Sequence, residues 1–216
     1  MINFIDVTVK HSDSRGIHNV SFNIQKGQFV YLMGPTGAGK STIINSILRA
    51  TLPNSGKIIV NDIDISLFTD IDLAYYRRNI GMIFQDFKLM SDRTIFENIA
   101  LPLQIIGSKK EIIVEKVEDI LIKVGLSHKN DAYPHELSGG EQQKICVARA
   151  LIKNPKIVVA DEPTGNLDPS SSDDIIDLLE SESKLGTTVI MATHNYPLIE
   201  NRIEHFIELN NGKVIS

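Results

Sequence analysis

One short glycine-rich stretch limits what this chain can fold into. Residues 34–41 read GPTGAGKS and follow an apolar run, residues 29–33, that is typical of a buried strand. The residues after it repeat apolar side chains at helical spacing: Ile43, Ile44, Ile47 and Leu48. The stretch therefore predicts a turn between a buried strand and the N-terminus of a helix.

The spacing G-x-x-x-x-G-K-S is that of a phosphate-binding loop. Its glycines let backbone N–H groups converge on phosphate oxygens, and the helix N-terminus adds partial positive charge. We expect Lys40 to reach the β- and γ-phosphates of ATP and the Ser41 hydroxyl to bind Mg²⁺. The alternative is an ordinary strand-to-helix turn that matches this motif by coincidence and binds no phosphate. The predicted nucleotide-binding residues here are Gly34, Pro35, Thr36, Gly37, Ala38, Gly39, Lys40, Ser41 and Thr42.

Two acidic residues end a second apolar run. Residues 157–160 read IVVA, without the alternation of a half-exposed strand, and Asp161 and Glu162 follow. Beside a phosphate cradle, we expect Asp161 to hold Mg²⁺ and Glu162 to act as general base for the attacking water. Alone, such a pair is more typical of the start of an exposed loop.

A second glycine-rich helix start lies far from the first, in the sequence LSGGEQ at residues 137–142. Backbone N–H groups of Ser138, Gly139 and Gly140, with the serine hydroxyl, are suited to cap a γ-phosphate from the opposite side. Alone, Gly-Gly before a helix is more typical of a hinge.

The remaining pattern predicts an α/β protein with an inserted helical region. Short apolar runs typical of strands fill the first sixty residues and return at 157–160 and 188–191, and the tail predicts a hairpin turning at 210–212. Residues 86–153 are mainly helical in pattern, and Ser108 and Glu111 have the spacing of a capping box.

Composition and charge exclude several classes of protein. The chain is 42% hydrophobic and 23% charged, as ordinary globular domains are. Its 22 basic and 27 acidic residues give a formal charge of −5 and no electrostatic case for nucleic-acid binding. No secretory leader and no run of roughly twenty apolar residues is present, so we expect no direct membrane insertion.

Six elements in order resemble the ATP-binding-cassette (ABC) ATPase family along essentially the whole chain. They are the phosphate loop, Gln85 after a strand, LSGGEQ, Asp161 with Glu162, the GNLD of residues 165–168, and His194. The resemblance implies a P-loop NTPase with a RecA-like core (about 1–85 and 154–216), an N-terminal antiparallel β-subdomain, and an inserted α-helical subdomain (about 86–153).

The resemblance also implies roles for single residues. Gln85 would sense Mg²⁺ and nucleotide, Asp168 would belong to the D-loop, and His194 would contact the γ-phosphate. Two copies would form a head-to-tail homodimer on binding ATP, with the cradle of one and the Ser138–Glu141 stretch of the other enclosing one nucleotide. His11 stands where the family usually has an aromatic residue that stacks on adenine.

Within the family, residues 80–103 with ADEPTGNLD and MATHN resemble the cell-division ATPases that pair with an FtsX-like integral membrane protein. This implies a peripheral protein on the cytoplasmic side of the inner membrane, with the partner docked at residues 87–90 and 94–96. The alternatives are LolD-type lipoprotein-release and MacB-type exporter ATPases. A soluble cassette ATPase or a kinase is a further alternative, but a kinase would leave LSGGEQ and His194 unexplained.

Overall fold

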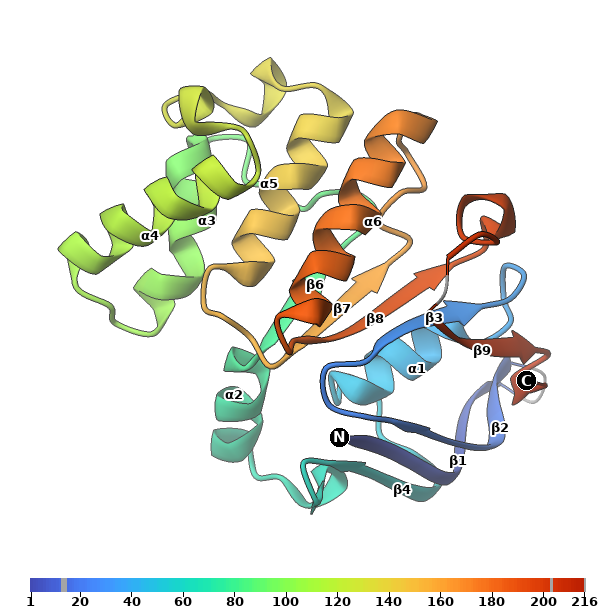
Figure 1. The fold of residues 1–216 in the computed structure, drawn as a ribbon. Coiled ribbons are helices and arrows are strands. Elements are labelled where there is room, and N and C mark those ends of the chain that lie inside the picture. Colours follow the sequence, from blue (N-terminus) through green and yellow to red (C-terminus); the bar gives the residue numbers. More distant parts are fainter. Residues whose placement is uncertain (13–14, 203, 216) are drawn as a thin grey trace.

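The computed structural model describes residues 1–12, 15–202 and 204–215. Its centre is a six-stranded sheet in the order β10-β9-β3-β8-β7-β6, parallel except for the β9–β10 pair. The first glycine-rich stretch follows β3 and the acidic pair ends β7 of this sheet, whereas the second glycine-rich stretch begins α5 (Gly139–Leu151), whose start lies away from the sheet (Figure 1). The strands are β3 (Phe29–Met33), β6 (Ile80–Ile83), β7 (Ile157–Asp161), β8 (Thr188–Thr193), β9 (His205–Asn210) and β10 (Lys213–Val214).

The central strands are apolar throughout because both of their faces are covered. In β3, all five residues are buried, and successive side chains enter different cores. Phe29 and Tyr31 pack in the core with the helical region, whereas Val30 and Leu32 pack in the core with the N-terminal strands. Strands β7 and β8, for which burial on both faces was predicted, show the same pattern. Val158 and Val189 lie in the first core, and Val159 and Ile190 lie in the second, which confirms the prediction.

A second, antiparallel sheet in the order β2-β1-β4-β5 lies apart from the central one. Helix α1 (Lys40–Ile47) packs between the two sheets, and its apolar residues share a core with both (Figure 1). The helix therefore begins where the sequence predicted and is held on two sides. The strands are β1 (Ile2–Ser12), β2 (Arg15–Ile24), β4 (Ser55–Val60) and β5 (Ile63–Asp64).

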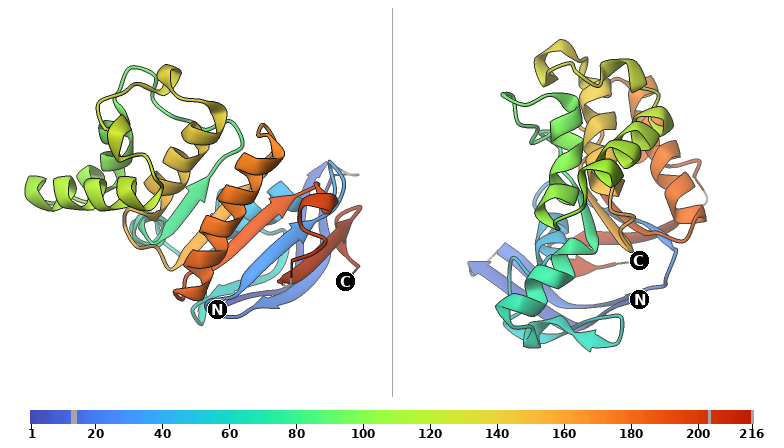
Figure 2. Two further views of the ribbon diagram at one scale, coloured as in Figure 1. Left: turned by 45° about the horizontal axis from the view of Figure 1, so that its top comes forward. Right: turned by 90° about the vertical axis from the view of Figure 1, so that its left-hand side faces the viewer.

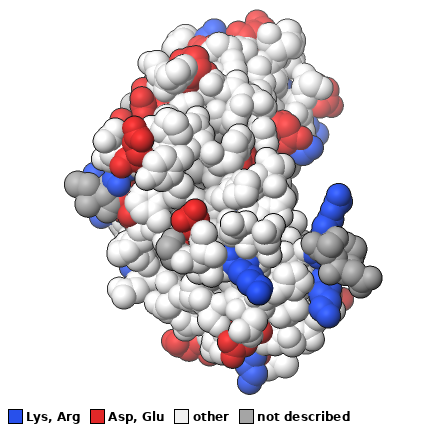
Figure 3. Space-filling view, turned by 90° about the vertical axis from the view of Figure 1, so that its right-hand side faces the viewer, with Lys and Arg blue, Asp and Glu red and all other residues white. Residues whose placement is uncertain are grey.

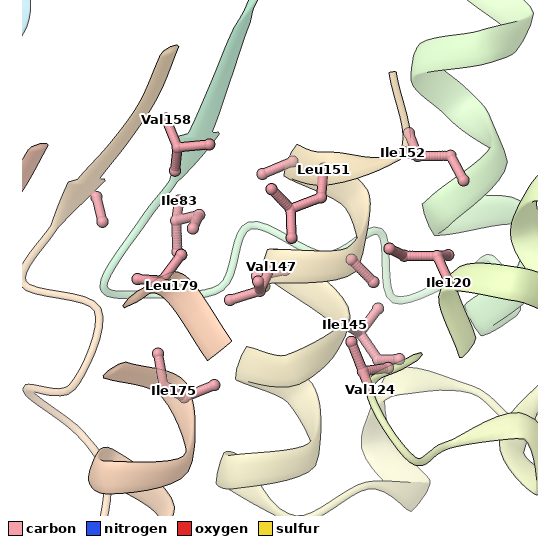
Figure 4. Packing of buried hydrophobic residues seen from close by; sticks show 14 of the residues in the cluster. Ile83, Ile120, Val124, Ile145, Val147, Leu151, Ile152, Val158, Ile175 and Leu179 are labelled. Carbon is pink, nitrogen blue, oxygen red and sulfur yellow. The ribbon is translucent and has the colours of Figure 1, made fainter. Parts of the chain in front are cut away.

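On the other face of the central sheet, α5 lies against β6 and α6 against β8, and α3 and α4 pack beyond α5 (Figure 2). Helix α5 lies between α6 and α4: its residues Ile145 and Val147 pack with Ile175 of α6 and Ile120 of α4 in one continuous core (Figure 4). The α5 N-terminus is thereby fixed relative to the sheet. The helices are α3 (Ile95–Ile105), α4 (Lys110–Lys123), α5 (Gly139–Leu151) and α6 (Pro169–Lys184).

Helix α2 (Asp70–Arg78) carries no buried residue, so no apolar stripe marks it in the sequence. A capping box between Thr69 and Asp72 starts it. Four short 3₁₀ turns complete the described structure: η1 (Ile65–Leu67), η2 (Ser127–Lys129), η3 (Pro134–Glu136) and η4 (Tyr196–Leu198).

The predicted capping box at Ser108 is wrong. Helix α4 begins one residue later, after Lys109, and no side chain caps it. Ser108 instead closes the preceding helix: its N–H donates to Leu103 O at 3.0 Å, and the N–H of Gly107, at φ 75°, donates to Gln104 O at 3.0 Å. This pair of bonds is a Schellman motif, which requires the left-handed glycine. The end of α3 thus sets the position of Ser108.

The tail hairpin is confirmed, with Asn211 and Gly212 both at positive φ between β9 and β10. No described helix is long and apolar enough to cross a membrane. On the face drawn in Figure 3, basic and acidic side chains form separated groups among uncharged residues.

Candidate functional site

The turn between β3 and α1 is shaped as a cradle. Gly39 precedes the helix at φ 111° and ψ 3°, a left-handed conformation that favours glycine. A Cβ on Gly34 would lie 2.2 Å from Leu209 O, so a larger residue would collide with β9. No side chain caps α1, and its first turn holds no acidic residue. Its leading N–H groups therefore have no partner inside the helix and no side-chain acceptor at its start.

Lys40 is almost completely buried and points back over the cradle. Its Nζ donates to Gly34 O at 2.7 Å and Pro35 O at 3.3 Å, and lies 3.3 Å from Glu162 Oε1. The cation is thus held between the carbonyls of the cradle and the carboxylate of Glu162.

Glu162 joins Lys40 to His194. Its Oε2 lies 2.9 Å from His194 Nδ1 and accepts from the His194 backbone N–H at 3.3 Å, while Oε1 faces Lys40. Glu162 has φ 49°, which is uncommon for a residue with a side chain and is typical of functional sites. The end of β7, the end of β8 and the start of α1 therefore meet at one carboxylate.

Asp161 ends β7 beside the cradle. The pKa of Asp161 is raised, mainly by burial and further by the neighbouring charge of Glu162. The hydrogen bond from Ser41 and the charge of Lys40 lower this pKa but do not cancel the rise. The Ser41 hydroxyl donates to Asp161 Oδ1 at 3.5 Å. Within the described residues no three His, Cys, Asp or Glu side chains converge to hold a metal. One hydroxyl and one carboxylate suit Mg²⁺, which keeps waters and phosphate oxygens as its other ligands.

These groups line one cleft of about 1070 Å³. From the predicted set it brings together His11, Thr36, Gly37, Gly39, Lys40, Ser41, Thr42, Gln85, Asp161, Glu162 and His194. His11 Nε2 lies 3.1 Å from Thr42 Oγ1, at one end of this set. Gly34, Pro35 and Ala38 belong to the cradle but do not line the cleft.

Sequence reasoning missed five lining residues: Arg15, Gly16, Phe84, Asp86 and Asn166. Three of them could have been predicted from the sequence, because residues next to a predicted site residue share its loop. Phe84 and Asp86 flank Gln85, and Asn166 belongs to the GNLD motif. Asn166 Nδ2 in fact donates to Gln85 O at 3.2 Å. Arg15 and Gly16 had no signal, because only the folding of β2 against β1 and α1 brings them there.

The second glycine-rich stretch lies outside this cleft. Its helix start is capped by its own side chains: Ser138 Oγ accepts from Glu141 N at 3.3 Å, and Glu141 Oε2 accepts from Ser138 N at 2.8 Å. The start of α6 is next to it, because a Cβ on Gly140 would lie 2.6 Å from Ser171 Oγ. Asp168 caps α6 by accepting from the Ser171 N–H at 3.0 Å and hydroxyl at 2.6 Å.

The ABC transporter family matches residues 17–165, a span that holds the cradle, LSGGEQ, Asp161 and Glu162. The chain belongs to the ABC transporter family. It is 42% identical over 216 residues to the cell division ATP-binding protein FtsE of Streptococcus pneumoniae, covering 100% of this chain and 94% of FtsE.

Two further similarities bear on function. The methionine import ATP-binding protein MetN of Haemophilus influenzae is 42% identical over 92% of this chain and 58% of MetN. The dimeric structure of MJ0796, a bacterial ABC transporter cassette, has a TM-score of 0.88 and 34% identity, covering 100% of this chain and 97% of the cassette.

A second dimeric structure of MJ0796 is a post-hydrolysis state bound to ADP and Pi. It matches with a TM-score of 0.87 and 33% identity, again over 100% and 97% of the two chains. The chain is an ABC-type ATPase cassette similar to FtsE, and cassettes of this family dimerise. The predicted family, P-loop NTPase fold and ATPase class are confirmed.

Proposed function

We propose that this chain is the ATP-hydrolysing subunit of an FtsEX-type cell-division complex. Two copies close on ATP and act on an FtsX-like integral membrane partner that regulates peptidoglycan hydrolysis. The identity of 42% to FtsE over 216 residues supports this most directly. On the same likeness we place the protein peripherally, on the cytoplasmic side of the inner membrane.

The contacts in the cleft support the assignment of roles. Mg²⁺ supplies charge neutralisation on the phosphate oxygens. Ser41 and Asp161 would hold it, because their oxygens are 3.5 Å apart at the edge of the cradle, and Gln85 lines the same cleft. Lys40 binds the β- and γ-phosphates, in place of the loop carbonyls that it contacts here.

Glu162 is the proposed general base. Its two carboxylate oxygens have different partners, Lys40 at Oε1 and His194 at Oε2. When Lys40 turns to the phosphates, Oε1 becomes available to accept a proton from the attacking water. His194 keeps the carboxylate oriented through Oε2 and stands beside the γ-phosphate. His11 is the proposed adenine neighbour.

The residues outside the cleft are assigned to a second copy. Ser138, Gly139, Gly140, Glu141 and Asp168 do not line the cleft of their own chain. They lie together, since the starts of α5 and α6 are in contact at Gly140 and Ser171. We propose that this pair of helix starts covers the nucleotide of the other protomer, so that one protomer alone hydrolyses ATP poorly.

The partner would dock at residues 87–90 and 94–96. Phe87, Leu89 and Phe96 are partly buried and pack against the larger core, which leaves part of each apolar surface accessible. An amphipathic helix of the partner suits such a surface.

A transporter function is the second candidate. MetN is as similar as FtsE by identity over the aligned residues, at 42% for each. The LolD-type and MacB-type alternatives also stay open. The membrane partner distinguishes all of these functions, because the ATP chemistry is common to them.

Glu162→Gln tests the ATPase mechanism. The amide keeps the shape but does not accept the proton, so turnover should fall by about 10²–10⁴, while ATP binding persists and a dimer accumulates. Glu200→Gln, at an exposed position outside the cleft, is the matched control. Turnover within twofold of wild type in Glu162→Gln would remove Glu162 from this role.

Capture from native membranes tests the complex. The tagged Glu162→Gln chain with ATP is used as bait on detergent-solubilised membranes, and the tag alone is the control. Recovery of an FtsX-like four-span protein supports the proposal. Recovery of a lipoprotein-release or methionine permease would replace it with the corresponding transporter function.

A further inference from the structure

Three side chains on one face of α5 bind the backbone of the loop that follows β6. Gln143, Cys146 and Arg149 are spaced three residues apart, so they lie on one side of the helix. Gln143 Nε2 donates to Phe84 O at 3.4 Å, and Cys146 Sγ contacts Phe87 O at 3.0 Å. The loop from Phe84 onward is thus attached to α5 through its carbonyl oxygens.

Arg149 makes the strongest of these attachments. Its Nη2 donates to Phe87 O at 2.8 Å and its Nη1 to Lys88 O at 2.6 Å. The planar guanidinium presents two donors in a fixed fork, which matches two successive carbonyls. A lysine has a single ammonium group and does not reproduce this geometry.

The backbone bound in this way is unusual. Phe87 has φ 58° and Lys88 has φ 51°, so two successive residues with side chains are left-handed. Such conformations persist only where the surroundings hold them, and they cluster at functional sites. The fork of Arg149 contacts the carbonyls of these two residues, so it holds the loop in this shape.

The charge of Arg149 has an unusual environment. Burial lowers its pKa, and no ion pair within the described residues includes it. A partly buried cation that binds carbonyls in place of a carboxylate gives up solvation without gaining a counter-charge. Burial also raises the pKa of the Cys146 thiol to about 12, so the S–H stays protonated and donates to Phe87 O.

The attached loop and helix connect two places that the proposed function uses. Phe84, Gln85 and Asp86 line the nucleotide cleft. The other end of the same rigid connection is the α5 N-terminus at Ser138, which is proposed to cover the nucleotide of a second copy. Helix α5 runs without a break from Gly139 to Leu151 and packs between α4 and α6 (Figure 4).

We propose that Arg149 is a positioning residue that makes residues 84–88 and α5 move as one body, and so couples Gln85 at one nucleotide to Ser138 at the other. The inference rests on the proposed two-copy ATPase mechanism. Arg149 itself is not among the residues that line the cleft.

Arg149→Met keeps an unbranched apolar stem and removes both donors. We expect kcat for ATP to fall about tenfold, as loss of a charged hydrogen bond predicts, with KM and ATP affinity of the isolated chain within twofold of wild type. Arg149→Lys should recover part of kcat. The control is Arg93→Met, which removes an exposed guanidinium whose one ion pair among the described residues is with Glu97, at 3.9 Å. It should leave kcat unchanged.

A double-mutant cycle separates positioning from general destabilisation. If Arg149 acts through the Gln85 loop, Arg149→Met should lower kcat about tenfold in the wild-type background and less than twofold in a Gln85→Ala background. Hydrogen exchange of residues 85–90 should also be faster in Arg149→Met. If Arg149→Met does not fold, the same cycle is run with Arg149→Lys.

Equal losses in both backgrounds, or a loss that follows the fraction unfolded, would overturn the proposal. The failure of the proposed function is distinguishable, because it would be seen as normal turnover in Glu162→Gln with Arg149 intact.

Discussion

The two glycine-rich helix starts, at α1 and at α5, differ in what satisfies their leading N–H groups. At α1 no side chain caps the helix and no acidic residue lies in the first turn. At α5 Ser138 and Glu141 form a reciprocal capping box and place a carboxylate at the helix start. The first is open to an anion, whereas the second is closed by its own side chains.

Two similar glycine-rich motifs at helix starts are therefore not equivalent phosphate sites. An uncapped start with a buried lysine supplies N–H groups and a cation for a triphosphate. A start capped by Glu141 already has a negative charge at its positive end, so a phosphate meets repulsion there. The Ser138 hydroxyl, which accepts from Glu141 N, still has its hydrogen to donate. We therefore expect α1 to bind ATP alone and α5 to contribute only in a dimer.

The largest expected effect is at the open start. Lys40→Ala removes the cation that the cradle holds, and charged hydrogen bonds contribute about 1.5–3 kcal/mol each. ATP affinity of the isolated chain should fall about tenfold to a hundredfold, measured with a fluorescent ATP analogue. Lys26→Ala, at an exposed position, is the control. Unchanged affinity in Lys40→Ala would show that α1 is not the site that binds ATP alone.

A smaller effect is expected at the closed start. Ser138→Glu should leave ATP affinity of the isolated chain unchanged and weaken the ATP-driven dimer about fivefold, because two like charges about 4 Å apart in water repel by about 1 kcal/mol. Light scattering in the Glu162→Gln background measures the dimer. Ser138→Ala is the control, since it also removes the cap at a cost of about 1 kcal/mol.

The same pair of sites gives a complementation test. A mixture of Lys40→Ala and Ser138→Glu chains assembles one composite site free of both changes. ATP turnover of the mixture should exceed that of either variant alone. A mixture no more active than its components contradicts a site shared between two copies.

The smallest effect concerns the carboxylate that closes α5. Hydrogen bonds from Ser138, chiefly its backbone N–H, lower the pKa of Glu141. The folded pKa is therefore below the unfolded value of about 4.3. The carboxylate contributes stability above that pH and loses it as pH falls through the folded pKa.

Glu141→Gln keeps the box and removes the charge, so we expect about 0.3–1 kcal/mol less stability at pH 7. Urea unfolding of both proteins at pH 7 and near pH 4 measures this. The difference between wild type and Glu141→Gln should narrow at the lower pH. If the difference in unfolding free energy between the two proteins is the same at both pH values, the negative charge of Glu141 is not what stabilises the start of α5.

Prediction from the sequence was most accurate where the apolar spacing and the phosphate-binding residues lie in the same short segment. The strand ending at Met33 and the helix beginning at Lys40 were expected from apolar spacing alone, and the structure has both. The prediction that Ser108 caps α4 was wrong, because the spacing of a capping box carries no information about the preceding helix. Ser108 belongs to the Schellman motif that ends α3. The α5 capping box was missed although its Ser-x-x-Glu spacing is present at residues 138–141.

The local elements, and the positions of charged, hydroxyl and amide groups along them, follow from residue type and spacing. Spacing sets amphipathic faces, and glycines set where the backbone turns. Which of these groups meet depends on how the strands and helices pack. Glu162, Lys40 and His194 come together because parallel strands end at one edge of the sheet, beside the start of α1. Arg149 binds carbonyls of Phe87 and Lys88, and since every residue has a carbonyl, no sequence pattern marks those two as its partners.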